Sequence, residues 1–186
     1  MVNHHHTRIA APLPAPPRSI AYVLHLMDIV RRGDPDEMKR AGDLTDLPRP
    51  WDPASCPEGL REDLWLWCDH VAAWINHEYA WRPTTMIPAC WPAHPHIARE
   101  LAVLAVLRYT AEQAPDPGPV EEWHRYSLPL FLDRMTARLG ESGCRSGNHI
   151  DWPAAARYAA FEDAAGERQR AIVADARPAV NVSGPA

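Results

Sequence analysis

Hydrophobic residues recur along the chain at the spacing of amphipathic helices, and proline-rich stretches separate these segments. The clearest segment spans Glu58 to Tyr79, where apolar side chains form two adjacent stripes and predict a helix with a wide buried face. A second helix is expected from Pro95 to about Gln113, because proline suits a first helical turn and residues 101–107 are apolar without a break. Strand signals are missing, so the sequence predicts an all-α fold.

The remaining helices are predicted from their ends and breaks. Ser19 is a candidate N-cap for a helix that stops near Gly33, and a short helix is possible within residues 34–42. Another helix should run from Pro119 to Gly140, with Pro129 inside it as a kink or a point of division. A last helix is expected from Trp152 to about residue 170. The prediction is therefore a single irregular bundle of about four to five helices with long proline-rich connections.

The two ends of the chain differ in composition from the middle. Residues 1–17 are rich in proline and alanine and are predicted to be a disordered arm, and residues 171–186 a flexible tail. At 186 residues the chain is expected to form one domain, here assigned to residues 18–170. The run His4, His5 and His6 is either an incidental feature of the arm or a weak metal-binding tract.

Charge limits the classes of partner. The formal net charge of −5 disfavours a general DNA-binding protein or one drawn to an anionic membrane. Association with nucleic acid stays open through one local basic group, formed by Arg31, Arg32, Lys39 and Arg40.

The best candidate for a secretory or membrane segment is residues 20–30. His25 and Asp28 interrupt it, and it is too short to span a bilayer. The expected location is therefore the cytoplasm, where the four cysteines would be thiols or metal ligands and not disulfides.

Two Cys/His pairs flank the two central helices. Cys90 and His94 directly precede the helix predicted from Pro95, while Cys144 and His149 follow the helix predicted to end at Gly140. Because a short turn joins two helices of nearly equal length, the start of one should lie near the end of the other. The four side chains are thus a candidate Cys2His2 zinc site, closed and structural. The alternative makes Cys90 a small buried hydrophobe, His94 a helix cap, and the other two solvated loop residues.

A second set of polar residues offers weaker candidates for catalysis. His77, Glu78 and Arg82, with His124, could supply a base, an acid and an anion clamp in a cleft. The second histidine of the H-E-x-x-H protease motif is missing, and no nucleophile motif or phosphate-binding loop is present. A binding or accessory protein with a macromolecular partner, most simply another protein, is therefore favoured over an enzyme. The eight tryptophans could line a partner groove or form the core itself.

Several of these segments together resemble a known family. They are "CWPAHP" at residues 90–95, the apolar helix that follows, "EEWHRYSLPLFLDRM" at residues 121–135, and the closing Cys-x4-His. They resemble an uncharacterised actinobacterial domain-of-unknown-function family that is frequent on plasmids and integrated mobile elements. The likeness covers roughly residues 58–152, but the family spaces its first cysteine and histidine more widely than Cys90 and His94. The resemblance implies a helical domain without an established activity and supplies no catalytic residues.

Overall fold

The computed structural model describes residues 10–140, 144, 149 and 154–176. These residues fall into two compact units, within 1–150 and 151–186, which are described separately. The division lies inside the range 18–170 that the sequence predicts as one domain. His4–His6, Trp152 and the end of the predicted tail lie outside the described residues.

The described residues form helices and no strand, which confirms the predicted all-α class. The helices are more numerous than the four to five expected. The N-terminal unit contains α1 (Arg18–Arg32), α2 (Pro35–Ala41), α3 (Glu58–Glu78), α4 (Pro95–Glu112), α5 (Gly118–Glu122) and α6 (Leu128–Leu139), with 3-10 turns at Pro53–Ser55, Pro83–Thr85 and Trp91–Ala93. The C-terminal unit contains α7 (Ala154–Asp163) and α8 (Ala165–Asp175). No helix in the described part of the chain is long and apolar enough to cross a membrane.

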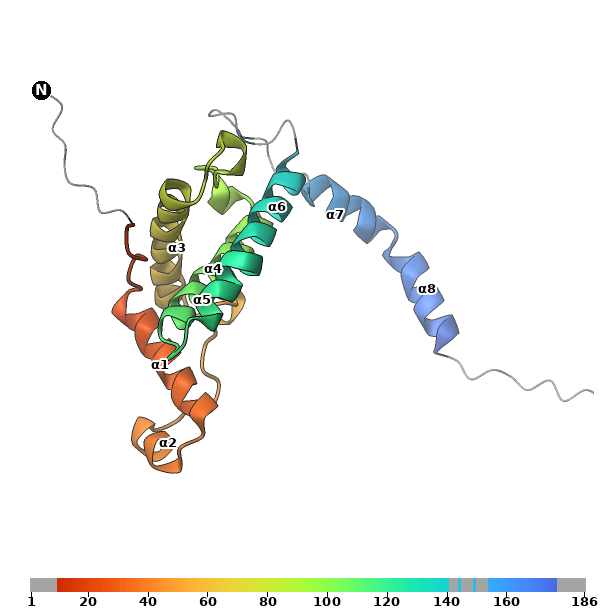
Figure 1. Cartoon of the computed structure of the whole chain (residues 1–186). Coiled ribbons are helices and arrows are strands. Elements are labelled where there is room, and N and C mark those ends of the chain that lie inside the picture. Colours follow the sequence, from red (N-terminus) through yellow and green to blue (C-terminus); the bar gives the residue numbers. More distant parts are fainter. Residues whose placement is uncertain (1–9, 141–143, 145–148, 150–153, 177–186) are drawn as a thin grey trace, which may run out of the picture. The chain divides into compact units, whose positions relative to one another are not determined.

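The core of the N-terminal unit is centred on α4, which packs against both α3 and α6 (Figure 1). The continuous apolar run of α4 allows burial on several sides, and the two stripes of α3 give it a wide inner face. Trp67, Trp74, Trp91 and Trp123 are buried in this core, as the core interpretation of the tryptophans predicts. Trp81, by contrast, is 94% exposed.

The first helix begins differently from the prediction. Pro17 occupies the N-cap of α1 and makes no side-chain cap, so the assignment of Ser19 as N-cap is wrong. The Ser19 hydroxyl lies in the first turn and donates a hydrogen bond to Asp63 on α3. The other end agrees with the prediction, because Gly33 adopts the left-handed conformation, with φ 68°, and donates its N–H to the Ile29 carbonyl.

The helix expected from Pro119 to Gly140 is divided, as the position of Pro129 indicated. A π-helical turn, Trp123–Ser127, connects α5 to α6, and Pro129 lies in the first turn of α6. A proline ring clashes with the carbonyl four residues earlier in a regular helix, and a widened turn removes this conflict. Gly140 ends α6, as predicted. The single helix expected between Trp152 and residue 170 is instead two helices, α7 and α8, that break at Ala164.

The part of the predicted arm that the structure describes packs against the N-terminal unit. We call residues 10–17 the strap; they run beside α3 (Figure 1). The Trp67 indole donates to the Pro14 carbonyl at 2.8 Å, and the Trp74 indole donates to the Ala11 carbonyl at 3.0 Å. Composition predicted disorder because a proline-rich segment buries little of its own surface. In the structure the strap is held because two tryptophans of α3 donate hydrogen bonds to its carbonyl groups.

Candidate metal centre

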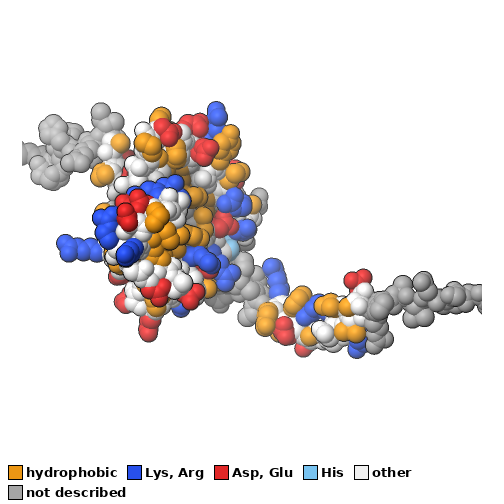
Figure 2. Space-filling model, turned by 90° about the horizontal axis from the view of Figure 1, so that it is seen from below, with side chains coloured by type: hydrophobic (Ala, Val, Ile, Leu, Met, Phe, Trp, Pro, Cys, Tyr) orange, Lys and Arg blue, Asp and Glu red, His pale blue; other side chains and the backbone are white. Residues whose placement is uncertain are grey.

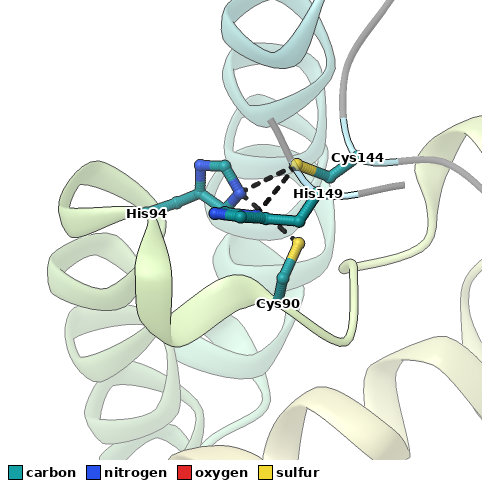
Figure 3. A group of neighbouring side chains, drawn as sticks. All are labelled: Cys90, His94, Cys144 and His149. Atoms are coloured by element: carbon teal, nitrogen blue, oxygen red, sulfur yellow. Dashed lines mark hydrogen bonds between the residues drawn. The ribbon is translucent and has the colours of Figure 1, made fainter. Parts of the chain in front are cut away.

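The two predicted Cys/His pairs meet where α4 begins and α6 ends (Figure 3). Cys90 and His94 flank the 3-10 turn Trp91–Ala93 that leads into α4, and Cys144 and His149 follow α6. The backbone of His94 occupies the N-cap of α4, but its side chain makes no cap hydrogen bond. The imidazole is directed at the cysteines instead. The interpretation of His94 as a side-chain helix cap is therefore wrong.

The distances within the cluster suit a tetrahedral metal ion. His94 Nε2 lies 3.4 Å from Cys90 Sγ and 3.1 Å from Cys144 Sγ, and Cys144 Sγ lies 3.6 Å from His149 Nδ1. All four ligand atoms lie within 4.8 Å of one another. A tetrahedral zinc ion with its usual bond lengths separates a sulfur and a nitrogen ligand by about 3.6 Å. The four side chains could thus hold one metal ion.

Local packing fixes the segment that carries the first pair. Trp91 is buried, and its indole donates to the Asp69 carboxylate at 3.2 Å. The Asn76 side chain accepts from the Ile87 N–H at 2.7 Å and donates to the Ile87 carbonyl at 2.9 Å, which attaches the preceding loop to α3. Pro92 and Pro95 restrict the backbone on both sides of the turn. Cys90 and His94 are therefore held by a prearranged scaffold.

Burial shifts the pKa values of two residues of the cluster, His94 and Cys90. His94 is only 3% exposed, and this burial, together with the nearby His149, lowers its pKa. The neutral imidazole that metal binding requires is thereby favoured. Burial, followed by the neighbouring Cys144 thiol, raises the pKa of Cys90. A metal ion that binds here must displace the Cys90 proton.

Ring contacts surround the histidines of the cluster. The His94 ring lies 5.3 Å from the His149 ring and 5.9 Å from the His96 ring, measured between centroids. His94 Nδ1 is buried without a hydrogen-bond partner among the described residues. A ligating histidine usually donates its second ring N–H to an acceptor, which fixes the ring. Here His94 is oriented by the contacts of its Nε2 atom with the two cysteine sulfurs and by packing against the two neighbouring rings. His96 was not singled out from the sequence, although it directly follows Pro95 and its ring lies beside that of His94.

Of the four weaker catalytic candidates, His77 and Glu78 contact each other, His124 contacts a tyrosine that was not a candidate, and Arg82 is exposed. His77 Nδ1 lies 2.5 Å from Glu78 Oε1, and the His77 hydrogen bond lowers the pKa of Glu78. His124 Nε2 lies 3.2 Å from the hydroxyl of Tyr79, a residue that the sequence did not single out. No hydrogen bond between the two pairs is present in the described part of the chain, so a common catalytic centre stays a prediction.

Comparisons of the chain with protein-family models, with curated proteins and with solved structures find no match. The resemblance to the actinobacterial family therefore stays a prediction.

Proposed function

We propose that the protein is a small helical binding or accessory protein, closed by a structural zinc ion at Cys90, His94, Cys144 and His149. The convergence of these four ligand atoms within 4.8 Å carries the proposal. Two thiolates and two imidazoles favour zinc over magnesium or calcium, which prefer oxygen ligands. Four protein ligands complete the tetrahedron and leave no position for a substrate or an activated water, which argues for a structural role.

The proposed ion would link segments far apart in the sequence. His94 and Cys144 are separated by 50 positions. A link across so long a loop lowers the entropy of the unfolded chain, and binding energy at such a site becomes folding energy. A reducing compartment such as the cytoplasm, which we propose as the location, keeps both thiols available as ligands.

Surface composition supports a binding role over catalysis. A groove of about 250 Å³ runs between α4 and the π turn and α6. Its lining includes Val103, Leu107, Tyr126 and Leu130, which are large hydrophobic residues left exposed. Figure 2 likewise shows exposed hydrophobic side chains among charged ones on the face drawn there. Exposed apolar patches of this kind are common at protein–protein contacts.

The alternative of nucleic-acid binding has weaker support. Arg31 and Arg32 both pair with Asp28, at 2.6 and 2.9 Å, and Arg32 also pairs with Glu37 at 2.7 Å. These carboxylates offset much of the local positive charge that phosphate binding needs. Binding assays at low and moderate salt would test this alternative.

Metal analysis of untagged protein tests the zinc proposal. The test is best made with His4, His5 and His6 replaced by alanine, so that the arm binds no zinc. We expect about one zinc per chain, and removal by a chelator should lower the free energy of unfolding by about 3 kcal/mol when zinc had been present at about a hundredfold above its Kd.

Matched variants separate the ligands from other cysteines and histidines. Cys144→Ala and His149→Ala should lose most of the bound zinc. Cys56→Ala and His70→Ala change residues outside the cluster and should retain it. Absence of zinc from the parent protein, with a melting temperature that chelators leave unchanged, would contradict the proposal.

A further inference from the structure

A second candidate site lies on α3, away from the metal cluster, and does not depend on the proposed zinc ion. Two tryptophans of this helix hold the strap through its backbone. Trp67 Nε1 donates to the Pro14 carbonyl at 2.8 Å, and Trp74 Nε1 donates to the Ala11 carbonyl at 3.0 Å. The strap therefore runs antiparallel to α3.

The spacing of these donors matches the repeat of a polyproline II helix. Trp67 and Trp74 are two helical turns apart, which is about 10.5 Å along α3. Ala11 and Pro14 are three residues apart, one full turn of polyproline II, which rises about 9.3 Å. Carbonyls one turn apart point to the same side of such a segment. One face of α3 can therefore bind successive turns of a proline-rich chain.

Further contacts define what this face recognises. Leu13 lies between the two bonded carbonyls and is 9% exposed, packed with the core cluster. Glu78 Oε2 accepts the N–H of Ala11 at 3.1 Å. Pro12 and Ala15 are exposed. The face thus contacts a buried leucine, two carbonyls one turn apart and a backbone N–H at the start of the segment.

We propose that this face of α3 is a recognition site for proline-rich peptide segments, occupied here by the chain's own strap. A Pro-Leu-Pro segment of a partner protein would take the same place when the strap leaves. A polyproline II segment has no internal hydrogen bonds, so its carbonyls are available, and its prolines limit the entropy lost on binding.

The strap acts as an intramolecular competitor at this site. A tethered segment has an effective concentration in the millimolar range, so a free peptide of micromolar affinity binds poorly while the strap is in place. The strap is anchored by few groups: the buried Leu13, the partly buried Ala11, the indole donors of Trp67 and Trp74, and the Glu78 carboxylate, which accepts the Ala11 N–H. We therefore expect the strap to open while the helices beneath it stay folded.

The test uses the full chain and a synthetic peptide with the sequence of residues 8–19, RIAAPLPAPPRS. Leu13→Asp in the protein places a charge in the leucine site and should release the strap. Ala15→Asp puts the same charge at an exposed strap position and is the matched control. Titration is followed by calorimetry and by the NMR signals of the indole N–H groups of Trp67 and Trp74.

We expect the Leu13→Asp protein to bind the peptide at least tenfold more tightly than the wild-type and Ala15→Asp proteins do, with shifts of both indole signals. A peptide in which alanine replaces every proline should bind at least tenfold more weakly. Circular dichroism establishes that each variant is folded, and Leu13→Ala serves as a milder variant if Leu13→Asp is not.

Two results would overturn the proposal. One is a folded, strap-released protein that does not bind the peptide, or that binds the proline-free peptide equally well. The other is a wild-type dimer that Leu13→Asp abolishes without any peptide binding, which would assign the face of α3 to the strap of a second copy.

Discussion

At the residue scale, Asn76 has the largest expected influence on the candidate metal centre without being one of its ligands. Its side chain makes two hydrogen bonds with the backbone of Ile87, three residues before Cys90. Asn76→Ala leaves a partly buried N–H and C=O without partners, which should cost about 1–3 kcal/mol of stability. The loosened loop should also weaken zinc binding by about tenfold.

Urea denaturation and competition with a zinc chelator measure these two effects of Asn76→Ala. Gln113→Ala removes an exposed amide at the end of α4 and should change stability by less than about 0.5 kcal/mol. Zinc affinity equal to that of the wild type, in an Asn76→Ala protein that is destabilised, would show that the loop does not orient Cys90.

Glu100 is expected to make stability depend on pH. Burial acts to raise the pKa of this carboxyl group, but hydrogen bonds from Arg134 and Arg138 outweigh it, and the pKa is lowered from 4.5. The contribution of Glu100 to the free energy of unfolding is therefore present above pH 4.5. It is lost as the pH falls through the lower pKa of the folded state. Both arginines are more than one third exposed, so solvent screening keeps the effect small.

We expect Glu100→Gln to lower the free energy of unfolding by about 0.5 kcal/mol at pH 7 and to have no effect near the acid limit. Urea denaturation of both proteins across the acid range measures the difference. Glu62→Gln, at an exposed position of α3, should match the wild type throughout. A deficit that stays constant as the pH falls would mean that the charge of Glu100 contributes nothing.

At the element scale, two glycines should respond to the same substitution in opposite directions. Gly33 ends α1 with φ 68°, and Gly59 lies in the first turn of α3; a Cβ added at either position would have no neighbouring atom within 4 Å. Gly33→Ala forces a side chain into the left-handed region and should cost about 1 kcal/mol. Gly59→Ala should stabilise by about 0.5–1 kcal/mol, because alanine favours helix. Thermal unfolding of the two variants measures both changes in stability. A stabilised Gly33→Ala protein would contradict this account.

The elements show which parts of the structure could be predicted from sequence. The bounds of α3 and α4 agree with the predictions to one residue, because prolines set their starts and wide apolar stripes set their extents. The nearly equal lengths expected for the two central helices also predicted that the Cys/His pairs would converge. The strap could not be predicted, since its partners Trp67 and Trp74 lie more than 50 positions away in the sequence. The hydrogen bonds between Asn76 and Ile87 could not be predicted either, because nothing in the sequence distinguishes that asparagine.

At the scale of the whole molecule, the two units differ in how their helices are stabilised. In the N-terminal unit, α3 and α4 bury many side chains in a common core. In the C-terminal unit, none of the described side chains of α7 and α8 is buried. These helices have 10 and 11 residues. Helices this short are marginal in water when no packing supports them.

Hydrogen exchange of the full chain should reveal this difference directly. Amides of α3 and α4 exchange only when the core opens, whereas those of α7 and α8 exchange through local unfolding of single helices. We therefore expect protection factors in α7 and α8 to be lower by at least about a hundredfold. Mass spectrometry of peptides from both units, at one pH and with zinc present, makes the comparison within one sample. Equal protection in α4 and α8 would contradict this expectation and would mean that a surface covers the exposed Phe161, Ile172 and Val173 in solution.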